Sequence, residues 1–128
     1  MKYLLDTHTL LWIVKDDPQL SNKARKCFLD EDNDIYVSIA SLWEVAIKLS
    51  LNRLTIEQSL NDFYNEHVTG NDIRLLNINI DHLVKLESLE HYHRDPFDRL
   101  LACQCLVEKM PIISKDKIFA KYSVKRVW

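Results

Sequence analysis

Four carboxylates fall where a chain of alternating strands and helices would place side chains that do chemistry. They are Asp6, Glu44, Asp98 and Asp116. Asp6 ends a short apolar strand, and Asp116 lies two residues beyond the apolar run 111–114. Glu44 lies two turns into one predicted helix, and Asp98 lies in the first turn of another. Functional groups in an open parallel sheet gather at the carboxyl ends of the strands, so we expect the four carboxylates to converge.

Converged carboxylates repel one another unless a counter-charge lies among them. The predicted site offers hard oxygen ligands and no nearby cluster of cysteines or histidines, a combination that suits Mg²⁺ or Mn²⁺. Such an ion typically handles phosphate oxygens, because it polarises the phosphoryl group and generates or orients a hydroxide nucleophile. The four acids therefore predict a metal-dependent enzyme that hydrolyses phosphodiester bonds.

Two carboxylates flank Pro96, where a helix over residues 96–109 is predicted to begin. Asp95 stands at the N-cap position and Pro96 suits the first helical position, so Asp98 falls at N3. Either carboxylate could simply cap the helix. We assign capping to Asp95 and metal ligation to Asp98, because Asp98 lies inside the helical turn that would face the crevice.

The other three acids also have structural interpretations. Asp6 could cap a helix that starts at Thr7, and Asp116 could cap the short turn that follows it. Glu44 completes a capping-box spacing with Ser41, although Ser38 is the better cap for that helix. The functional interpretation therefore depends on the joint placement of the acids and not on any one of them.

The histidines give weaker signals than the acids. His8 lies beside the first acid and could shape its surroundings, although such a residue is more often structural or solvent-facing. His91 and His93 lie in a predicted loop, from which they could approach a substrate. His67 and His82 carry no functional signal.

The elements that must position these residues alternate along the chain. Strands are predicted over residues 2–6, 35–37, 73–78, 111–114 and, as a possible fifth, 124–128. Helices are predicted over residues 7–15, 21–29, 38–49, 55–64, 81–89 and 96–109, with a short helical piece at 118–122. This alternation predicts an α/β protein with a parallel sheet of four to five strands and helices on both faces. If the strand order is 3-2-1-4-5, Asp6 and Asp116 face each other across the crevice.

Chain length, net charge and glycine content exclude several kinds of domain organisation and function. A chain of 128 residues is long enough for one domain with its own core, and we expect residues 1–128 to form that single domain. The net charge of −2 argues against binding to long duplex nucleic acid, which usually requires a strong excess of basic residues. The single glycine, Gly70, excludes a P-loop and a dinucleotide-binding fingerprint.

Composition also bears on location. Charged residues make up 28% of the chain, and no run approaches the roughly 20 apolar residues of a membrane helix. The N-terminus reaches Asp6 after only three apolar residues, so we expect no signal peptide. We expect a cytoplasmic protein whose three cysteines are free core thiols. They are Cys27, Cys103 and Cys105.

Four sequence blocks, spread over nearly the whole chain, resemble the PIN-domain family and specifically the VapC-type toxins of bacterial toxin–antitoxin pairs. The blocks are Tyr3-Leu4-Leu5-Asp6-Thr7-His8, residues 38–48, His93-Arg94-Asp95-Pro96-Phe97-Asp98-Arg99-Leu100-Leu101-Ala102, and Ile112-Ile113-Ser114-Lys115-Asp116. The third block is the most specific. The chain departs from the family pattern at Asn52, where Gly is frequent, and at Ser114, where Thr is commoner.

The resemblance implies a three-layer PIN fold and a Mg²⁺- or Mn²⁺-dependent endoribonuclease. It implies metal ligation by Asp6 and Asp98, with Glu44 and Asp116 completing the acidic cluster. The residues expected in auxiliary positions are Asp95, Ser114, whose hydroxyl would assist, and Thr7. The implied partners are an RNA substrate, a second copy of the chain in a homodimer, and an antitoxin protein that folds over the site.

Two other functions compete with the ribonuclease. A phosphatase of the haloacid dehalogenase type also begins with an Asp at a strand end, but it needs a second Asp two residues later, where this chain has His8. The other alternative is a catalytically silent PIN-like module that binds RNA or protein. The presence of all four acids argues against the silent module.

Overall fold

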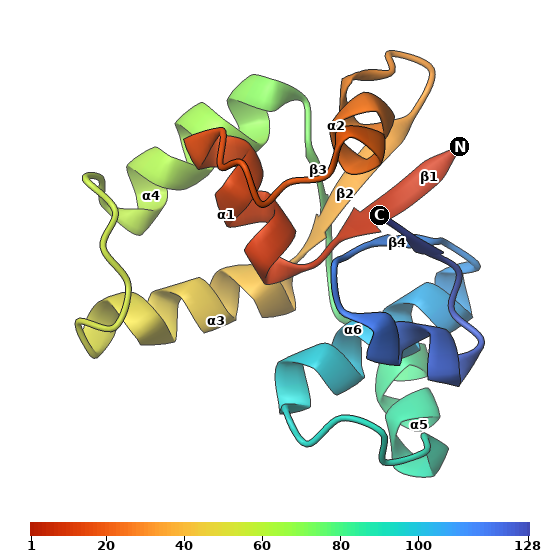
Figure 1. The fold of residues 1–128 in the computed structure, drawn as a ribbon. Helices are drawn as coiled ribbons and strands as arrows, with labels where there is room; N and C mark the ends of the chain where they lie inside the picture. Colours follow the sequence, from red (N-terminus) through yellow and green to blue (C-terminus); the bar gives the residue numbers. More distant parts are fainter.

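A computed structural model describes residues 1–128, and its centre is a five-stranded parallel sheet (Figure 1). The strands are β1 (Lys2–Leu5), β2 (Asp34–Ser38), β3 (Arg74–Leu76), β4 (Ile112–Ile113) and β5 (Arg126–Val127). Their order across the sheet is β3-β2-β1-β4-β5, and every neighbouring pair is parallel. This confirms the predicted fold class and strand order, and it places β1 beside β4.

Helices connect the strands. They are α1 (Thr7–Lys15), α2 (Asn22–Leu29), α3 (Ile39–Ser50), α4 (Leu60–Phe63), α5 (Ile80–Ser88) and α6 (Pro96–Glu108). A π-helical turn and a 3₁₀ turn follow α4, and the 3₁₀ helix η3 (Lys117–Tyr122) joins β4 to β5. The α1, α2 and α4 helices gather at the top of Figure 1, whereas α5, α6 and η3 gather at the bottom.

Two hydrophobic cores cover the two faces of the sheet. Successive residues of a strand point to opposite faces, so Leu4 and Leu5 of β1 enter different cores. Leu5 packs with residues of α1, α3 and α4 such as Val45 and Phe63, and Leu4 packs with residues of α6 and η3 such as Leu101. Burial on both faces explains why the central strands are continuous apolar runs.

Two predicted helix starts were wrong. The α5 helix begins after Asn79 and not at Asp81, because the Asn79 side chain accepts a hydrogen bond from the His82 amide and the His82 ring accepts one from the Asn79 amide. The helix predicted from Thr55 begins only at Leu60, after the cap Ser59. Neither change affects the elements that carry the four acids.

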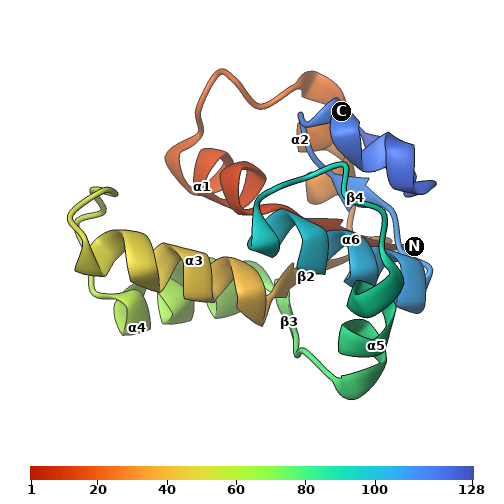
Figure 2. The same cartoon turned by 90° about the horizontal axis from the view of Figure 1, so that it is seen from below.

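The long helix α3 projects to one side of the sheet, with α4 beside it in both views (Figure 2). Ser38, at the end of β2, caps α3 by accepting a hydrogen bond from the Ala40 amide at 3.0 Å. The strand therefore passes directly into the helix that carries Glu44. None of the helices combines the length and the apolar character that a bilayer crossing requires.

Candidate metal centre

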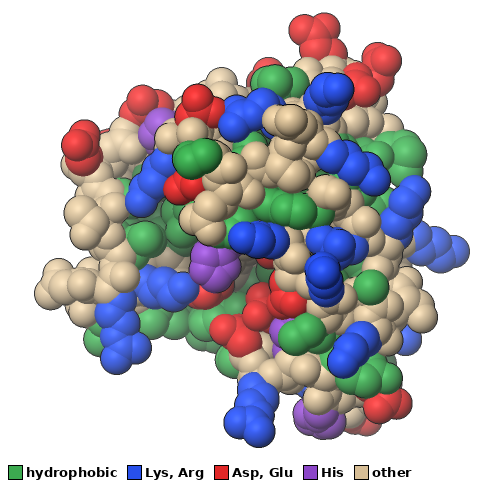
Figure 3. Space-filling view, viewed as in Figure 1, with side chains coloured by type: hydrophobic (Ala, Val, Ile, Leu, Met, Phe, Trp, Pro, Cys, Tyr) green, Lys and Arg blue, Asp and Glu red, His purple; other side chains and the backbone are tan.

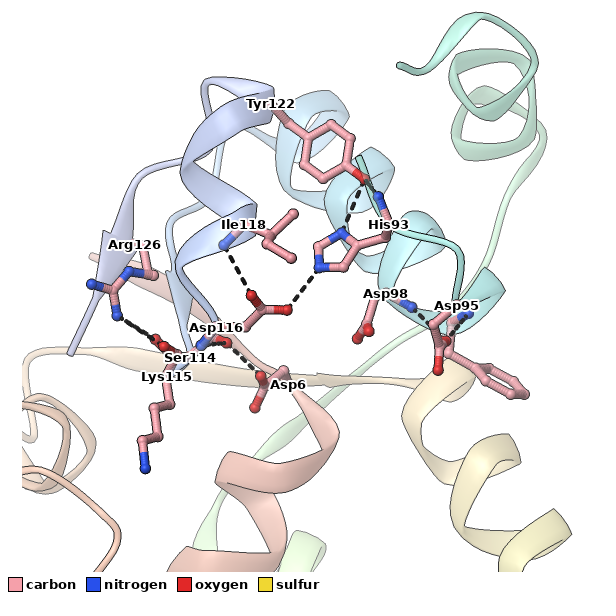
Figure 4. Close-up of polar contacts among 11 residues, drawn as sticks. Asp6, His93, Asp95, Asp98, Ser114, Lys115, Asp116, Ile118, Tyr122 and Arg126 are labelled. Atoms are coloured by element: carbon pink, nitrogen blue, oxygen red, sulfur yellow. Dashed lines mark hydrogen bonds and ion pairs between the residues drawn. The ribbon is translucent and has the colours of Figure 1, made fainter. Parts of the chain in front are cut away.

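The candidate site lies where β1 and β4 end side by side. Leu5 is paired with Ile113, so the next residues, Asp6 and Ser114, are neighbours although 108 positions separate them. The Ser114 hydroxyl donates a hydrogen bond to Asp6 Oδ2, and both residues are buried. Figure 4 shows Asp6, Asp98 and Asp116 arriving from three different elements around a common space.

Asp6 is both a helix cap and a member of the acidic group. Its Oδ1 accepts a hydrogen bond of 2.8 Å from the Thr9 amide at the start of α1, while its Oδ2 accepts the one from Ser114. Burial raises the pKa of the Asp6 carboxyl, and the hydrogen bonds from Ser114 and Thr9 oppose that rise only in part. The capping interpretation therefore holds for Asp6, and capping leaves the residue within the acidic group.

Ser114 also connects the site to Asp116. The Asp116 amide donates to Ser114 Oγ at 3.0 Å, so one hydroxyl bridges two acids. Asp116 Oδ1 in turn accepts from the Ile118 amide at 2.9 Å and caps η3. This cap fixes the direction in which the Asp116 carboxylate leaves the chain.

The two carboxylates that flank Pro96 have separate environments. Asp95 Oδ1 accepts hydrogen bonds from the amides of Phe97 and Asp98, at 2.8 and 3.1 Å, and is the N-cap of α6 as predicted. The Asp98 carboxylate has no hydrogen-bond or ion-pair partner in the chain. Burial first, and then the negative charges of Asp95, Asp6, Glu44 and Asp116, raise the pKa of Asp98 to about 7.

Glu44 belongs to the same negative field but is already partnered. Its Oε1 accepts a hydrogen bond of 2.7 Å from the Thr7 hydroxyl, and its Oε2 lies 2.9 Å from Lys48 Nζ. The capping box with Ser41 does not form, because Ser38 caps α3 instead. Lys48 was not predicted from the sequence, although its spacing of four residues from Glu44 is the spacing of ion pairs along a helix.

His93 lies in the predicted loop. It is buried there, with only 6% of the residue exposed, and is not open to a substrate as the loop position had suggested. Arg99 ties that loop down by donating to the carbonyls of Leu89 and Glu90. Donor atoms of His93, Asp98 and Asp116 all lie within 4.8 Å of one another. The burial of His93 depends on contacts with residues far along the chain, so the local sequence could not reveal it.

The remaining histidines make no hydrogen bond to the four acids, although the charge of His8 opposes the rise in the pKa of Asp6. His8 and His91 are exposed, and the His8 ring packs 5.7 Å from the Trp12 ring. His82 is fully buried, and its Nε2 lies 2.9 Å from Glu108 Oε1. The spacing of three residues between Asn79 and His82 was the only sequence signal for that arrangement.

The donor set fits a hard divalent cation. Asp98 is a half-buried carboxylate without a partner, and the charges of four other carboxylates raise its pKa. No positively charged group of the chain offsets the charge of Asp98. Carboxylate oxygens are the ligands that Mg²⁺ and Mn²⁺ favour, so a bound cation could supply that charge. Figure 3 shows acidic side chains gathered in a hollow at the centre of one face, with Lys and Arg side chains near its rim.

Comparison with known proteins agrees with this architecture. The family model for the PIN domain matches residues 3–125. This chain belongs to the PIN domain family. A search of curated proteins found no match.

Solved structures of similar fold cover almost the whole PIN domain. VapBC2 from Rickettsia felis, bound to a DNA fragment from its promoter, has a TM-score of 0.74 at 13% identity, over 98% of this chain and 97% of that one. DNA-bound VapBC from Salmonella typhimurium has a TM-score of 0.70 at 14% identity, over 98% and 96%. FitAcB from Neisseria gonorrhoeae has a TM-score of 0.67 at 16% identity, over 97% and 95%. These likenesses show the shared fold.

Proposed function

We propose that this PIN domain is a metal-dependent endoribonuclease and the toxin of a toxin–antitoxin pair. The observation that carries the proposal is the Asp98 carboxylate, which is half-buried without a partner and lies near the charges of four other acids. A nuclease that uses Mg²⁺ or Mn²⁺ needs such an uncompensated cluster, because the cation supplies the missing charge. A protein that used these acids only as helix caps would leave Asp98 unexplained.

The residues proposed to hold the cation are Asp6, Asp98 and Asp116, with Glu44 completing the cluster. When bound, the cation would polarise the phosphoryl group and lower the pKa of the attacking water. Ser114 would keep Asp6 and Asp116 in register through its bridging hydroxyl. Asp95 would fix where α6 starts and thereby where Asp98 points.

Glu44 would be oriented by its two partners. Thr7 holds one carboxylate oxygen and Lys48 holds the other, and Lys48 comes from the next turn of the same helix. The Lys48 ammonium offsets one of the negative charges near Asp98. The net deficit of positive charge is therefore concentrated among the three aspartates.

Two observations support an antitoxin partner. The sequence blocks resemble VapC-type toxins, and the similar solved structures are VapBC and FitAB complexes. We propose that this chain likewise binds a cognate antitoxin, forms a homodimer and acts on RNA in the cytoplasm. A small neighbouring reading frame for the antitoxin is the genomic expectation.

The test is purified protein incubated with total cellular RNA, with Mg²⁺ in one sample and EDTA in the other, followed by mapping of new RNA ends. We expect discrete cuts that require the metal and that disappear in Asp98→Asn, a variant of the same shape that loses no contact. Cuts that persist in that variant would place the chemistry elsewhere. Retention of RNA without any cut would favour the catalytically silent module.

A further inference from the structure

A buried chain of hydrogen bonds runs from Tyr122 through His93 to Asp116. The His93 backbone amide donates to the Tyr122 hydroxyl oxygen at 2.7 Å, and that oxygen lies 3.0 Å from His93 Nδ1. On the other side of the ring, His93 Nε2 lies 2.7 Å from Asp116 Oδ2. Figure 4 shows Tyr122, His93 and Asp116 in this spatial order. His93 and Asp6 lie to different sides of Asp116.

The donors and acceptors in these contacts indicate which groups carry the protons. A backbone amide can only donate, so the Tyr122 oxygen accepts there and its own hydrogen is free for the nearest acceptor, His93 Nδ1. On the other side, a carboxylate oxygen can only accept, so the His93 Nε2 that lies 2.7 Å from Asp116 Oδ2 carries a proton and donates it. The other neutral tautomer would bring the Nε2 lone pair against a carboxylate oxygen at 2.7 Å, which is repulsive.

Two aromatic rings pack against the His93 ring and hold it in this arrangement. It stacks on Tyr122 with ring centroids 5.4 Å apart and an interplanar angle of 19°, and its centroid lies 4.8 Å from that of Phe119. The His93 side chain is 5% exposed, whereas the Asp116 side chain is 34% exposed. His93 therefore supports the carboxylate from the protein side and leaves its open side free.

We propose that His93 is a positioning residue of the metal centre and not one of its ligands, an inference that rests on the proposed function. The donor atoms of His93, Asp98 and Asp116 are close enough for all three residues to bind one ion. Both ring nitrogens are already engaged, Nε2 with Asp116 Oδ2 and Nδ1 with the Tyr122 hydroxyl, so neither offers a free lone pair to an ion. The role of His93 is to hold Asp116 Oδ2, while the Ile118 amide holds Oδ1. Carboxylates that bind metals are commonly oriented by such hydrogen bonds.

The first test reads the proton directly and needs no RNA. Nitrogen-15 NMR of the histidine rings, with the His93 signals assigned by their loss in His93→Gln, should show Nε2 protonated and Nδ1 bare. Addition of Mg²⁺ should leave the Nε2 proton in place. A proton on Nδ1 alone, or loss of the Nε2 proton on metal binding, would overturn the proposal.

The second test measures Mn²⁺ binding by electron paramagnetic resonance in three variants. His93→Gln places an amide donor near the position of Nε2 and should bind Mn²⁺ nearly as well as the wild type. His93→Leu fills similar space without a donor and should bind roughly 10- to 100-fold more weakly. Tyr122→Phe keeps the ring stack but frees the tautomer, and its affinity should fall between the two.

The same variants separate positioning from catalysis. In His93→Leu we expect RNA cleavage to need more Mn²⁺ for half-saturation, while the rate at excess Mn²⁺ recovers most of the wild-type value. Wild-type affinity in His93→Leu, or equally weak binding in His93→Gln and His93→Leu, would overturn the proposal. If His93→Leu does not fold, the Mn²⁺ affinity of Tyr122→Phe and the NMR experiment still test the positioning role of His93. Wild-type protein that binds Mn²⁺ as described but cuts no RNA would instead count against the proposed ribonuclease.

Discussion

The negative charge of Asp98 lowers the stability of the folded chain. Its carboxylate is mostly buried, has no partner and lies among other acids, so the folded chain favours its neutral form. Asp98→Asn keeps the shape and removes the charge. We expect this variant to have a higher melting temperature than the wild type at pH 8 in EDTA, and to cleave RNA no faster than the EDTA background. A lower melting temperature would mean that Asp98 makes a stabilising contact.

The pH dependence of stability follows from the same residue. The pKa of Asp98 is about 7 in the folded chain and 3.8 in an ordinary setting, so between these values the folded state holds more protons. Stability from this group is therefore complete below about pH 4 and is lost as the pH rises through 7. In EDTA, the melting temperature of the wild type should fall relative to that of Asp98→Asn between pH 5 and pH 8. Parallel curves for the two proteins would contradict this.

For individual residues, the sequence predicted the position correctly where the neighbouring strand or helix start determines it. Asp6 and Asp116 follow strands that a parallel sheet must bring together, and Asp98 follows a recognisable cap. It failed for His93, whose burial depends on Tyr122, 29 residues further along the chain. No local pattern encodes such a contact.

The start of α6 is the element on which the site geometry depends. The single Asp95 oxygen accepts from two amides of the first turn, so Asp95→Ala should lower the free energy of unfolding by about 1 kcal/mol. Asp95→Asn, which can still cap, should lose much less. Chemical denaturation of both variants measures this difference. Loss of RNA cleavage in Asp95→Asn at unchanged stability would mean that the roles of Asp95 and Asp98 are reversed.

Helix starts also show where prediction from sequence ends. Ser38 and Asp95 were correctly identified as caps because each stands directly before an apolar helical run. The start of α5 was misplaced because Asn79 and Asp81 are both good caps, and the choice between them was made by the His82 side chain. That side chain is oriented by Glu108 on α6, which is a tertiary contact.

At the scale of the whole molecule, the cation should act as a stabilising ligand. A cation that binds only the folded state adds about 2.7 kcal/mol when present at 100 times its dissociation constant. Mn²⁺ should therefore raise the melting temperature of the wild type by several degrees, and EDTA should reverse the rise. Asp98→Asn is the matched control and should respond much less. An equal response in both proteins would place the binding site away from Asp98.

The pairing of β1 with β4 also determines when the site can exist. The ribosome makes Asp6 well before its neighbour Ser114, which comes 108 residues later. At typical synthesis rates that interval takes roughly 5 to 20 s. The growing chain cannot assemble the acidic centre during this time, because the strand that brings Ser114 and Asp116 has not been made. The proposed ribonuclease activity therefore cannot begin until β4 and the Asp116 that follows it have been translated.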